Sequence, residues 1–271
     1  MFLNEREGFL DTAVRAARLA GELILRNLGR VSKKDIGLKQ ASDFVTRVDK
    51  ESEEIIVGTI KEEFPNHAFL AEESVKEAGT GGYRWIIDPL DGTTNYIHAY
   101  PVFSVSIALE YAKEIVMGVI LDPLRDELFT AEKGNGAFLN ENRIRVSGTR
   151  TLKESLITTG FPFRNKDIID EYLELFRKLF LRASDLRRAG SAAIDLAYLA
   201  CGRCDAFFEF GLSPWDIAAG SLIIQEAGGI VTGFSGRPDY LSTGNIVAGN
   251  PFLHGELLKE VMSVFAGPAP P

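Results

Sequence analysis

The sequence has little cysteine, little histidine and no long hydrophobic run, and each shortage excludes a class of protein. With 2 cysteines among 271 residues, a scaffold held together by disulfides is excluded. No apolar stretch approaches the roughly 18 residues that a membrane-spanning helix needs. The histidines, His67, His98 and His254, follow no spacing that is typical of a zinc site.

Basic residues are scarce relative to acidic ones. The sequence has 30 Lys and Arg against 38 Asp and Glu, which gives a formal net charge of -8. Binding to a nucleic-acid backbone needs a basic face, so we expect no nucleic acid and no membrane as partner. A small anionic substrate stays open, because a bound cation can reverse the local field. The N-terminal segment lacks the basic-then-apolar order of a signal peptide, which favours a cytoplasmic protein.

Apolar periodicity in the first half predicts helices followed by an antiparallel meander. Helices are expected over 4–28, capped by Asn4, and over 49–64, with a polar surface loop at 30–42 between them. A two-residue hairpin turn is expected at 112–113. The expected strands are 67–71, 83–87, 102–111, 114–121, 127–131 and 136–139.

From about residue 150, strands alternate with helices, which predicts a layered α/β half. The expected strands are 156–159, 185–188, 206–210, 230–232 and 246–248, and the expected helices are 167–181, 191–201 and 214–227. We therefore predict one compact unit in two halves, 1–150 and 151–271, split near 145–155. The Pro-rich tail at 267–271 is expected to be frayed.

The segment 85–95, WIIDPLDGTTN, carries the clearest chemical signal. An apolar strand leads into Asp88 and Asp91, two carboxylates that can converge on one hard cation. Gly92 and Thr93 then offer backbone N–H groups to an anion. Asp, Pro and Gly are also the common turn formers, so this motif alone leaves a purely structural turn open.

Three further segments can bring carboxylates to the same place. Glu72 and Glu73 follow a predicted strand, Asp216 falls in the first turn of the helix after Ser213, and Asp49 begins the second helix. Each also has a plainer interpretation. Glu72 and Glu73 could be solvated acids, Asp216 could only complement the helix dipole, and Asp49 could only cap its helix.

Together, these segments resemble the inositol monophosphatase family of magnesium-dependent, lithium-sensitive sugar phosphatases over nearly the whole chain. The segments that carry the resemblance are 43–49, 72–74, 88–95, 190–193 and 215–229. Ala71 and Ser213 depart from the usual family pattern without removing a ligand. The resemblance implies the α/β (α+β) class, as a layered αβαβα sandwich with an antiparallel N-terminal sheet and a mixed C-terminal sheet.

The resemblance also implies an inositol-1-monophosphatase-like phosphoric monoester hydrolase that uses two or three Mg²⁺ ions, for which Mn²⁺ could substitute. The implied metal ligands are Glu72, Asp88, the Leu90 carbonyl, Asp91 and Asp216. The implied catalytic residues are Glu72, Thr93 and Asp49, with Asp49 acting through the Thr93 hydroxyl. The implied substrate-binding residues are Asp91, Gly92, Thr93, Gly190, Ser191, Ala192 and Glu209.

The expected reaction is direct, in-line attack of water on the phosphorus of a small phosphorylated polyol or sugar, without a phosphoenzyme. A fructose-1,6-bisphosphatase, a dual-specificity sugar phosphatase or a nucleotide 3′-phosphatase are alternatives with the same chemistry. A binding partner in a transcription antitermination complex is an alternative of another class. The resemblance further implies a homodimer.

Three smaller features are each open to two interpretations. Cys201 and Cys204 form a C-x-x-C pair, which is either a redox pair or two small residues at a helix end. Arg187 and Arg188 either steer an anionic substrate or pair with surface acids. Lysines 33, 34 and 39 are either solvated or take part in substrate gating.

Overall fold

The computed structural model describes residues 8–32, 34, 36–40, 43–73, 76–163 and 165–265. Helices and 3-10 turns are α1 (Phe9–Asn27), α2 (Arg47–Glu63), α3 (Thr93–Ile97), η2 (Leu152–Glu154), η3 (Lys166–Ile168), α4 (Ile169–Phe180), α5 (Ala192–Ala200), α6 (Pro214–Glu226), α7 (Tyr240–Thr243) and α8 (His254–Phe265). Strands are β1 (Ile36–Gln40), β2 (Asp43–Thr46), β3 (Ala68–Ala71), β4 (Lys76–Glu77), β5 (Tyr83–Asp91), β6 (Ser104–Tyr111), β7 (Glu114–Asp122), β8 (Glu127–Glu132), β9 (Gly136–Leu139), β10 (Asn142–Ile144), β11 (Leu156–Thr159), β12 (Asp185–Arg187), β13 (Ala206–Glu209), β14 (Ile230–Thr232) and β15 (Ile246–Gly249).

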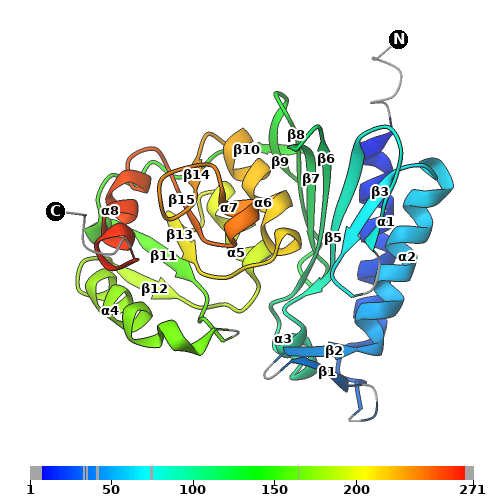
Figure 1. The fold of residues 1–271 in the computed structure, drawn as a ribbon, viewed down its shortest axis with the longest axis horizontal. Coiled ribbons are helices and arrows are strands. Elements are labelled where there is room, and N and C mark those ends of the chain that lie inside the picture. Colours follow the sequence, from blue (N-terminus) through cyan, green and yellow to red (C-terminus); the bar gives the residue numbers. More distant parts are fainter. Residues whose placement is uncertain are drawn as a thin grey trace.

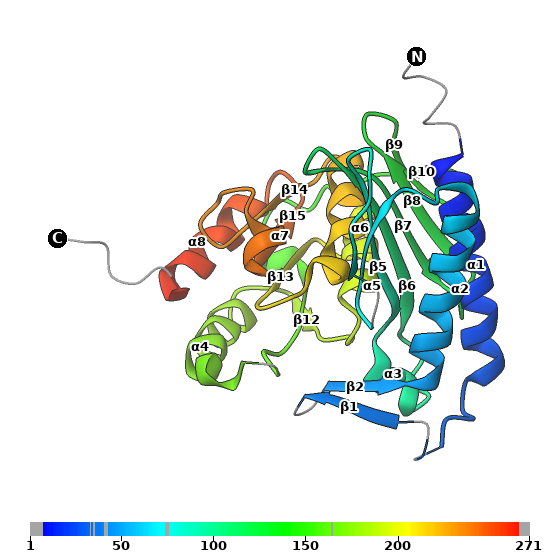
Figure 2. The same ribbon diagram turned by 45° about the vertical axis from the view of Figure 1, so that its right-hand side comes forward.

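These elements stack in layers of helix, sheet, helix, sheet and helix (Figure 1). Helices α1 and α2 cover one face of an eight-stranded sheet, and α5 and α6 lie between its other face and a five-stranded sheet (Figures 1 and 2). Helices α4 and α8 pack together on the outer side of the five-stranded sheet. The expected αβαβα sandwich is confirmed.

The strand directions agree with the expected sheets. Strands β5 to β10 form an antiparallel meander, while β3 joins its edge parallel to β5. In the second sheet, β11 runs parallel to β12 and β13, and β15 runs antiparallel to β13 and β14. Ala112 and Lys113 have φ of 51° and 69°, as a two-residue hairpin turn requires.

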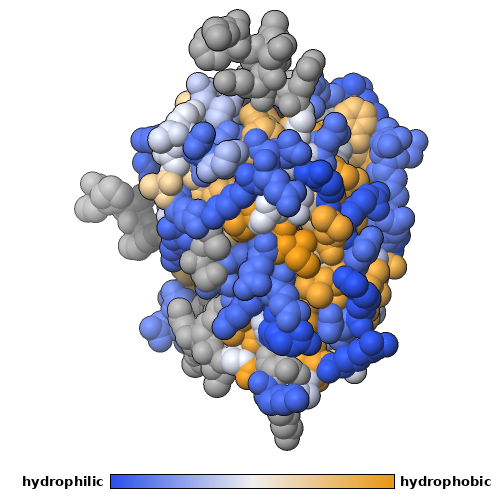
Figure 3. All heavy atoms as spheres, turned by 90° about the vertical axis from the view of Figure 1, so that its right-hand side faces the viewer, coloured by the Kyte–Doolittle hydropathy of each residue, from blue (hydrophilic) through white to orange (hydrophobic). Residues whose placement is uncertain are grey.

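The helical layer of α1 and α2 forms because each helix has one apolar stripe. Helix α1 buries Phe9, Ala13, Ala17 and Ile24 at helical spacing against the sheet. The side of the molecule on which α1 and α2 lie is mostly hydrophilic, with an apolar area among the hydrophilic residues (Figure 3). Among the described helices, none is long and apolar enough to cross a bilayer.

The prediction of a surface loop over 30–42 is wrong where β1 forms. Strand β1 pairs antiparallel with β2, with Ile36 opposite Thr46, in a two-stranded sheet of its own. Its sequence, IGLKQ, has too little apolar alternation to predict a strand. Helices α3, α7 and α8 and strands β2, β4 and β10 were also not expected. Asn4, Lys33, Ser42, Ser74 and the tail 267–271 lie outside the described residues.

Helix α6 lies directly on strand β7 because small residues face one another there. A Cβ atom on Gly118 of β7 would come within 2.8 Å of the Ala219 carbonyl oxygen of α6. On the other side of α6, a Cβ on Gly220 would come within 2.6 Å of Leu196 of α5. The missing side chains let α6 sit in close contact with both neighbours, which fixes its height above the sheet.

The segment between the two sheets is held by one buried side chain. Strand β10 ends at Ile144 and β11 begins at Leu156, so the chain passes between the sheets in the segment where we predicted the split. Asn250 is 0% exposed, and its Nδ2 donates at 2.9 Å to both Ser147 Oγ and the Thr149 carbonyl. Its Oδ1 accepts from the backbone N–H groups of Phe252 and Leu253, just before α8. The division into two halves stays a prediction.

We expect Asn250→Ala to lower the free energy of unfolding by about 3 kcal/mol, because it leaves several buried hydrogen-bonding groups without their partner. Urea titration followed by circular dichroism measures this change. Asn250→Asp is the matched comparison, since it keeps the acceptor for α8 and removes the donor to the linker. An Ala variant as stable as the parent protein would mean that the linker needs no anchor.

Candidate active site

Three aspartates from two distant segments meet at the inner end of β5. The pairing of β5 with β6 is interrupted between Asp88 and Asp91, so the strand bends where both carboxylates stand. Asp216 comes from the first turn of α6, where Pro at the first helical position suits the start of the helix. One carboxylate oxygen each from Asp88, Asp91 and Asp216 lie within 4.8 Å of one another.

A pocket of about 290 Å³ contains this cluster and is lined by residues of both sheets. All but one of the expected site residues line it, namely Glu72, Asp88, Leu90, Asp91, Gly92, Thr93, Gly190, Ser191, Ala192, Glu209 and Asp216. The exception is Asp49, which lies behind Thr93. Other residues complete the wall without having been expected, among them Phe44, Asn95, Gly160, Asp195 and Leu212.

The chemistry of these donors fits a hard divalent cation. Burial raises the pKa of Asp88 well above its usual range, and the charges of Glu72, Asp91 and Asp216 raise it further. A cation among these oxygens offsets both the burial and the repulsion. Carboxylate and carbonyl oxygens are the ligands that Mg²⁺ prefers, and no described residue of the pocket is His or Cys. Glu72 stands at the edge of this set, outside the group of three whose oxygens all lie within 4.8 Å.

Asp49 serves as part of a helix cap and as a partner of Thr93 at the same time. It is 0% exposed, and its Oδ2 accepts from the Thr46 backbone N–H at 2.9 Å and from the Thr46 hydroxyl, closing the cap of α2. Its Oδ1 accepts from Thr93 Oγ1 at 2.7 Å. Because the hydroxyl has one hydrogen, this bond leaves the lone pairs of Thr93 to accept a hydrogen from the pocket.

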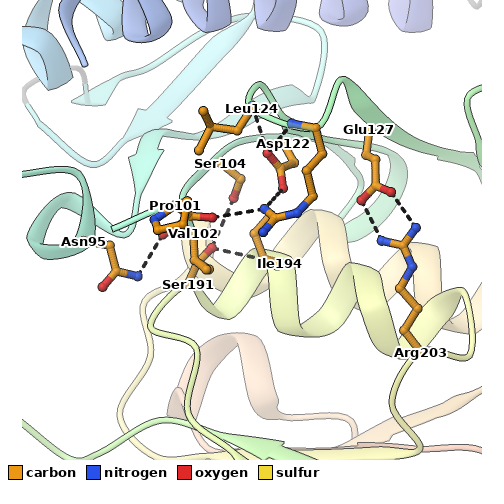
Figure 4. Close-up of polar contacts among 11 residues, drawn as sticks. Asn95, Pro101, Val102, Ser104, Asp122, Leu124, Glu127, Ser191, Ile194 and Arg203 are labelled. Atoms are coloured by element: carbon orange, nitrogen blue, oxygen red, sulfur yellow. Dashed lines mark hydrogen bonds and ion pairs between the residues drawn. The ribbon is translucent and has the colours of Figure 1, made fainter. Parts of the chain in front are cut away.

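The start of α5 holds the carboxylate of Asp91 across the two halves of the chain. Asp91 Oδ2 accepts from Ser191 Oγ at 2.6 Å and from the Ala193 backbone N–H at 2.8 Å. Ser191 is also the N-cap of α5, and Ser104 Oγ lies 3.3 Å from it (Figure 4). Helix N-termini favour negative charge, so this arrangement stabilises and orients the Asp91 carboxylate.

Asn95 joins the pocket segment 88–95 to the start of α5. Its Nδ2 donates at 2.8 Å to the Val102 carbonyl (Figure 4) and at 3.0 Å to the Ala189 carbonyl. At the far end of α5, Arg203 pairs with both carboxylate oxygens of Glu127. Helix α5 is therefore tied to the first sheet at both ends. Asn95 belongs to the 88–95 motif, but the motif alone does not indicate this contact.

The two adjacent arginines have different surroundings, and the two cysteines of the C-x-x-C pair are both free thiols. Arg187 forms an ion pair with Asp185 at 2.5 Å, whereas Arg188 lines the pocket. Cys201 is the C-cap of α5, Cys204 is buried, and both thiols are free. Burial raises the pKa of both thiols, which disfavours the reactive thiolate form.

The site is therefore a cluster of carboxylates in a layered α/β protein that could hold a divalent cation. The model of the inositol monophosphatase family matches residues 5–265, and the chain belongs to this family. The Nus factor SuhB of Pseudomonas aeruginosa is 51% identical over 246 residues, which cover 89% of this chain and 91% of that protein.

Two solved structures are similar to this chain over nearly its whole length. The extragenic suppressor protein SuhB from Bartonella henselae superimposes with a TM-score of 0.89 at 43% identity, covering 93% of this chain and 97% of that one. An inositol monophosphatase from Anabaena (Nostoc) sp. gives a TM-score of 0.86 at 42% identity, covering 96% and 97%.

We expect Mg²⁺ to raise the melting temperature, because an ion that binds only the folded state adds about 2.7 kcal/mol of stability at a hundred times its dissociation constant. Differential scanning fluorimetry with and without Mg²⁺ measures the shift. Asp216→Asn should remove most of it by deleting one charge of the cluster. Glu114→Gln, at an exposed ion pair with Lys133, is the control that should keep it. An equal shift in the Asp216 variant would place the ion elsewhere.

Proposed function

We propose that this protein is a Mg²⁺-dependent phosphomonoesterase that hydrolyses a phosphorylated polyol, with a myo-inositol monophosphate as its substrate. The observation that carries this proposal is the meeting of Asp88, Asp91 and Asp216 within 4.8 Å, beside Gly92 and Thr93 in one pocket. Membership of the inositol monophosphatase family supports it.

In this proposal, Glu72, Asp88, the Leu90 carbonyl, Asp91 and Asp216 hold two or three Mg²⁺ ions. Bound Mg²⁺ supplies activation of water and neutralises charge on the phosphoryl oxygens, and Mn²⁺ could replace it. The bonds from Leu90 N to Asp88, from Ala193 N to Asp91 and from Ser213 N to Asp216 aim the carboxylates before any ion binds.

The chain's own residues orient the water and the phosphate. Thr93, held by Asp49, and Glu72 accept hydrogens from the attacking water and so fix its direction. Gly92 has a φ of 93°, and a Cβ there would lie 2.9 Å from the Val102 carbonyl oxygen, so this turn requires glycine. In this proposal, the backbone N–H groups of Gly92 and Thr93 bind the phosphate. Gly190, Ser191, Ala192 and Glu209 line the side of the pocket that would receive the polyol.

Inhibition by lithium and a homodimeric state belong to the same proposal because membership of the family implies them. A location in the cytoplasm is proposed with them.

The proposal is tested by measuring phosphate release from D-myo-inositol 1-phosphate, fructose 1,6-bisphosphate and a nucleotide 3′-phosphate, with Mg²⁺ and with chelator. We expect Mg²⁺-dependent release with the inositol ester preferred. Asp91→Asn should lose turnover by about a thousandfold while folding normally, because it keeps the shape and removes charge from the cluster. Absence of Mg²⁺-dependent release from all three esters by the parent protein would rule the proposal out.

The role of Thr93 gives a second kinetic prediction. Thr93→Val removes the hydroxyl and should lower kcat about a hundredfold, while the Mg²⁺-induced rise in melting temperature persists. Thr93→Ser keeps the hydroxyl within reach of Asp49 and should keep most of the turnover. If the Val variant turns over within about threefold of the parent protein, water is oriented by other groups.

The name of the Pseudomonas relative, Nus factor, supports a second function as a partner in a transcription antitermination complex. Such a complex contains nucleic acid, so this function conflicts with our expectation from the net charge of -8 that no nucleic acid is a partner. Gel filtration with purified RNA polymerase tests it. Asp91→Asn tells the two functions apart, because a binding function that does not need catalysis should survive this change.

A further inference from the structure

Three charged side chains form the wall of the pocket on the side of the second sheet. Arg188 follows β12, Asp195 lies in the first turns of α5, and Glu209 ends β13, and all three line the same pocket as the aspartate cluster. Asp195 is only 3% exposed and Glu209 only 7%, whereas Arg188 is exposed. From here on, these three residues are called the distal triad.

No side chain of the distal triad forms a hydrogen bond or a close ion pair with any residue that the structure describes. Arg188 stacks its guanidinium over the ring of Phe161, at 5.3 Å from the ring centroid. The Glu209 carboxylate packs against the backbone of Gly160, where a Cβ would lie 1.9 Å from Oε1. Neither carboxylate has an oxygen that is both fully buried and without a partner, so these oxygens are open to the pocket and can accept hydrogen bonds from a ligand there.

Charged groups of the pocket change the pKa values of the two acids of the distal triad. Burial raises the pKa of both Asp195 and Glu209 well above the usual range, the charge of Asp91 raises both further, and the charge of Arg188 lowers both. The distal triad thus carries two acids and one base. A second phosphate group would meet net negative charge here, whereas neutral hydroxyl groups can donate to the carboxylates and accept from the guanidinium.

Asp195 is placed to act on the substrate through the same helix that holds Asp91. Ala193 N and Ser191 Oγ bind the Asp91 carboxylate, and Asp195 lies two residues further along α5. Ala192 and Asp195, three residues apart, lie on the face of α5 that lines the pocket. Helix α5 therefore sets the distance between the Asp91 carboxylate and the Asp195 carboxylate, which would accept a hydrogen bond from the polyol.

We propose that Asp195 and Arg188 complete, together with Glu209, a subsite that binds the hydroxyl groups of an uncharged polyol, and that Asp195 selects against substrates with a second phosphate. The proposal rests on the proposed function and names the residues that set its substrate class.

The test compares kcat and KM of Asp195 variants on D-myo-inositol 1-phosphate and fructose 1,6-bisphosphate at saturating Mg²⁺. Asp195→Ala should raise KM for the inositol ester about tenfold, as loss of one hydrogen bond to a charged group does. Its kcat should stay within about threefold, since the phosphorus is not touched. Asp195→Asn should raise the relative kcat/KM for the bisphosphate about fivefold or more, because it removes one repelling charge.

A stability measurement separates binding from a merely structural role. Removing a buried carboxylate without partners should raise the melting temperature by about 2 °C, whereas removing a structural residue would lower it. Asp185→Asn is the matched control, since Asp185 pairs with Arg187 outside the pocket and should leave KM unchanged. If Asp195→Ala fails to fold, Asp195→Asn carries the test alone.

Unchanged KM for the inositol ester in a folded Asp195→Ala variant overturns this proposal and leaves the proposed function intact. So does an unchanged preference between the two esters in Asp195→Asn. If the parent protein hydrolyses neither ester, the proposed function fails. The subsite is then tested by the melting-temperature shift that D-myo-inositol 1-phosphate causes in the presence of Mg²⁺. A shift that Asp195→Ala loses and Asp185→Asn keeps supports the subsite, and any other result overturns it.

Discussion

Repulsion among the acids around Asp88 is the constraint on which the rest of the site depends. Four carboxylates share one end of a buried strand, and Asp88 itself is 1% exposed. Carboxylates this close repel one another, so they keep their positions only with a bound cation or with hydrogen bonds to the backbone. Here Asp88, Asp91 and Asp216 each accept a backbone N–H, from Leu90, Ala193 and Ser213, so their directions are set by the chain itself.

The two halves of the chain contribute to different parts of the pocket. Gly92 and Thr93 come from the end of β5 and the start of α3, whereas Arg188, Asp195 and Glu209 come from around the second sheet. Side chains on the second half can therefore change without disturbing most of the acids of the first.

The sequence predicts the sandwich and most of the pocket because those features leave local patterns. The apolar strand before Asp88 and the Ser-Pro start of α6 indicate where the carboxylates stand, and the resemblance adds Glu209. Contacts between residues distant in the chain leave no such pattern. We therefore did not expect the hydrogen bonds of Asn250 to the segment between the sheets or those of Asn95 to the Val102 and Ala189 carbonyls. Asp195 was missed because an acid in the first turns of a helix usually has a structural role. Strand β1 was missed because polar strands lack apolar alternation.

The close contact between Gly118 and Ala219 has a consequence for how the protein tolerates change. Asp216 sits one turn before Ala219 on α6, and at Gly118 the helix backbone lies against the backbone of β7 with no side chain between them. The distance between Asp216 and the two aspartates of β5 therefore depends on a position of β7 that carries no side chain. Any side chain at position 118 would displace α6, and Asp216 with it, although Gly118 does not line the pocket.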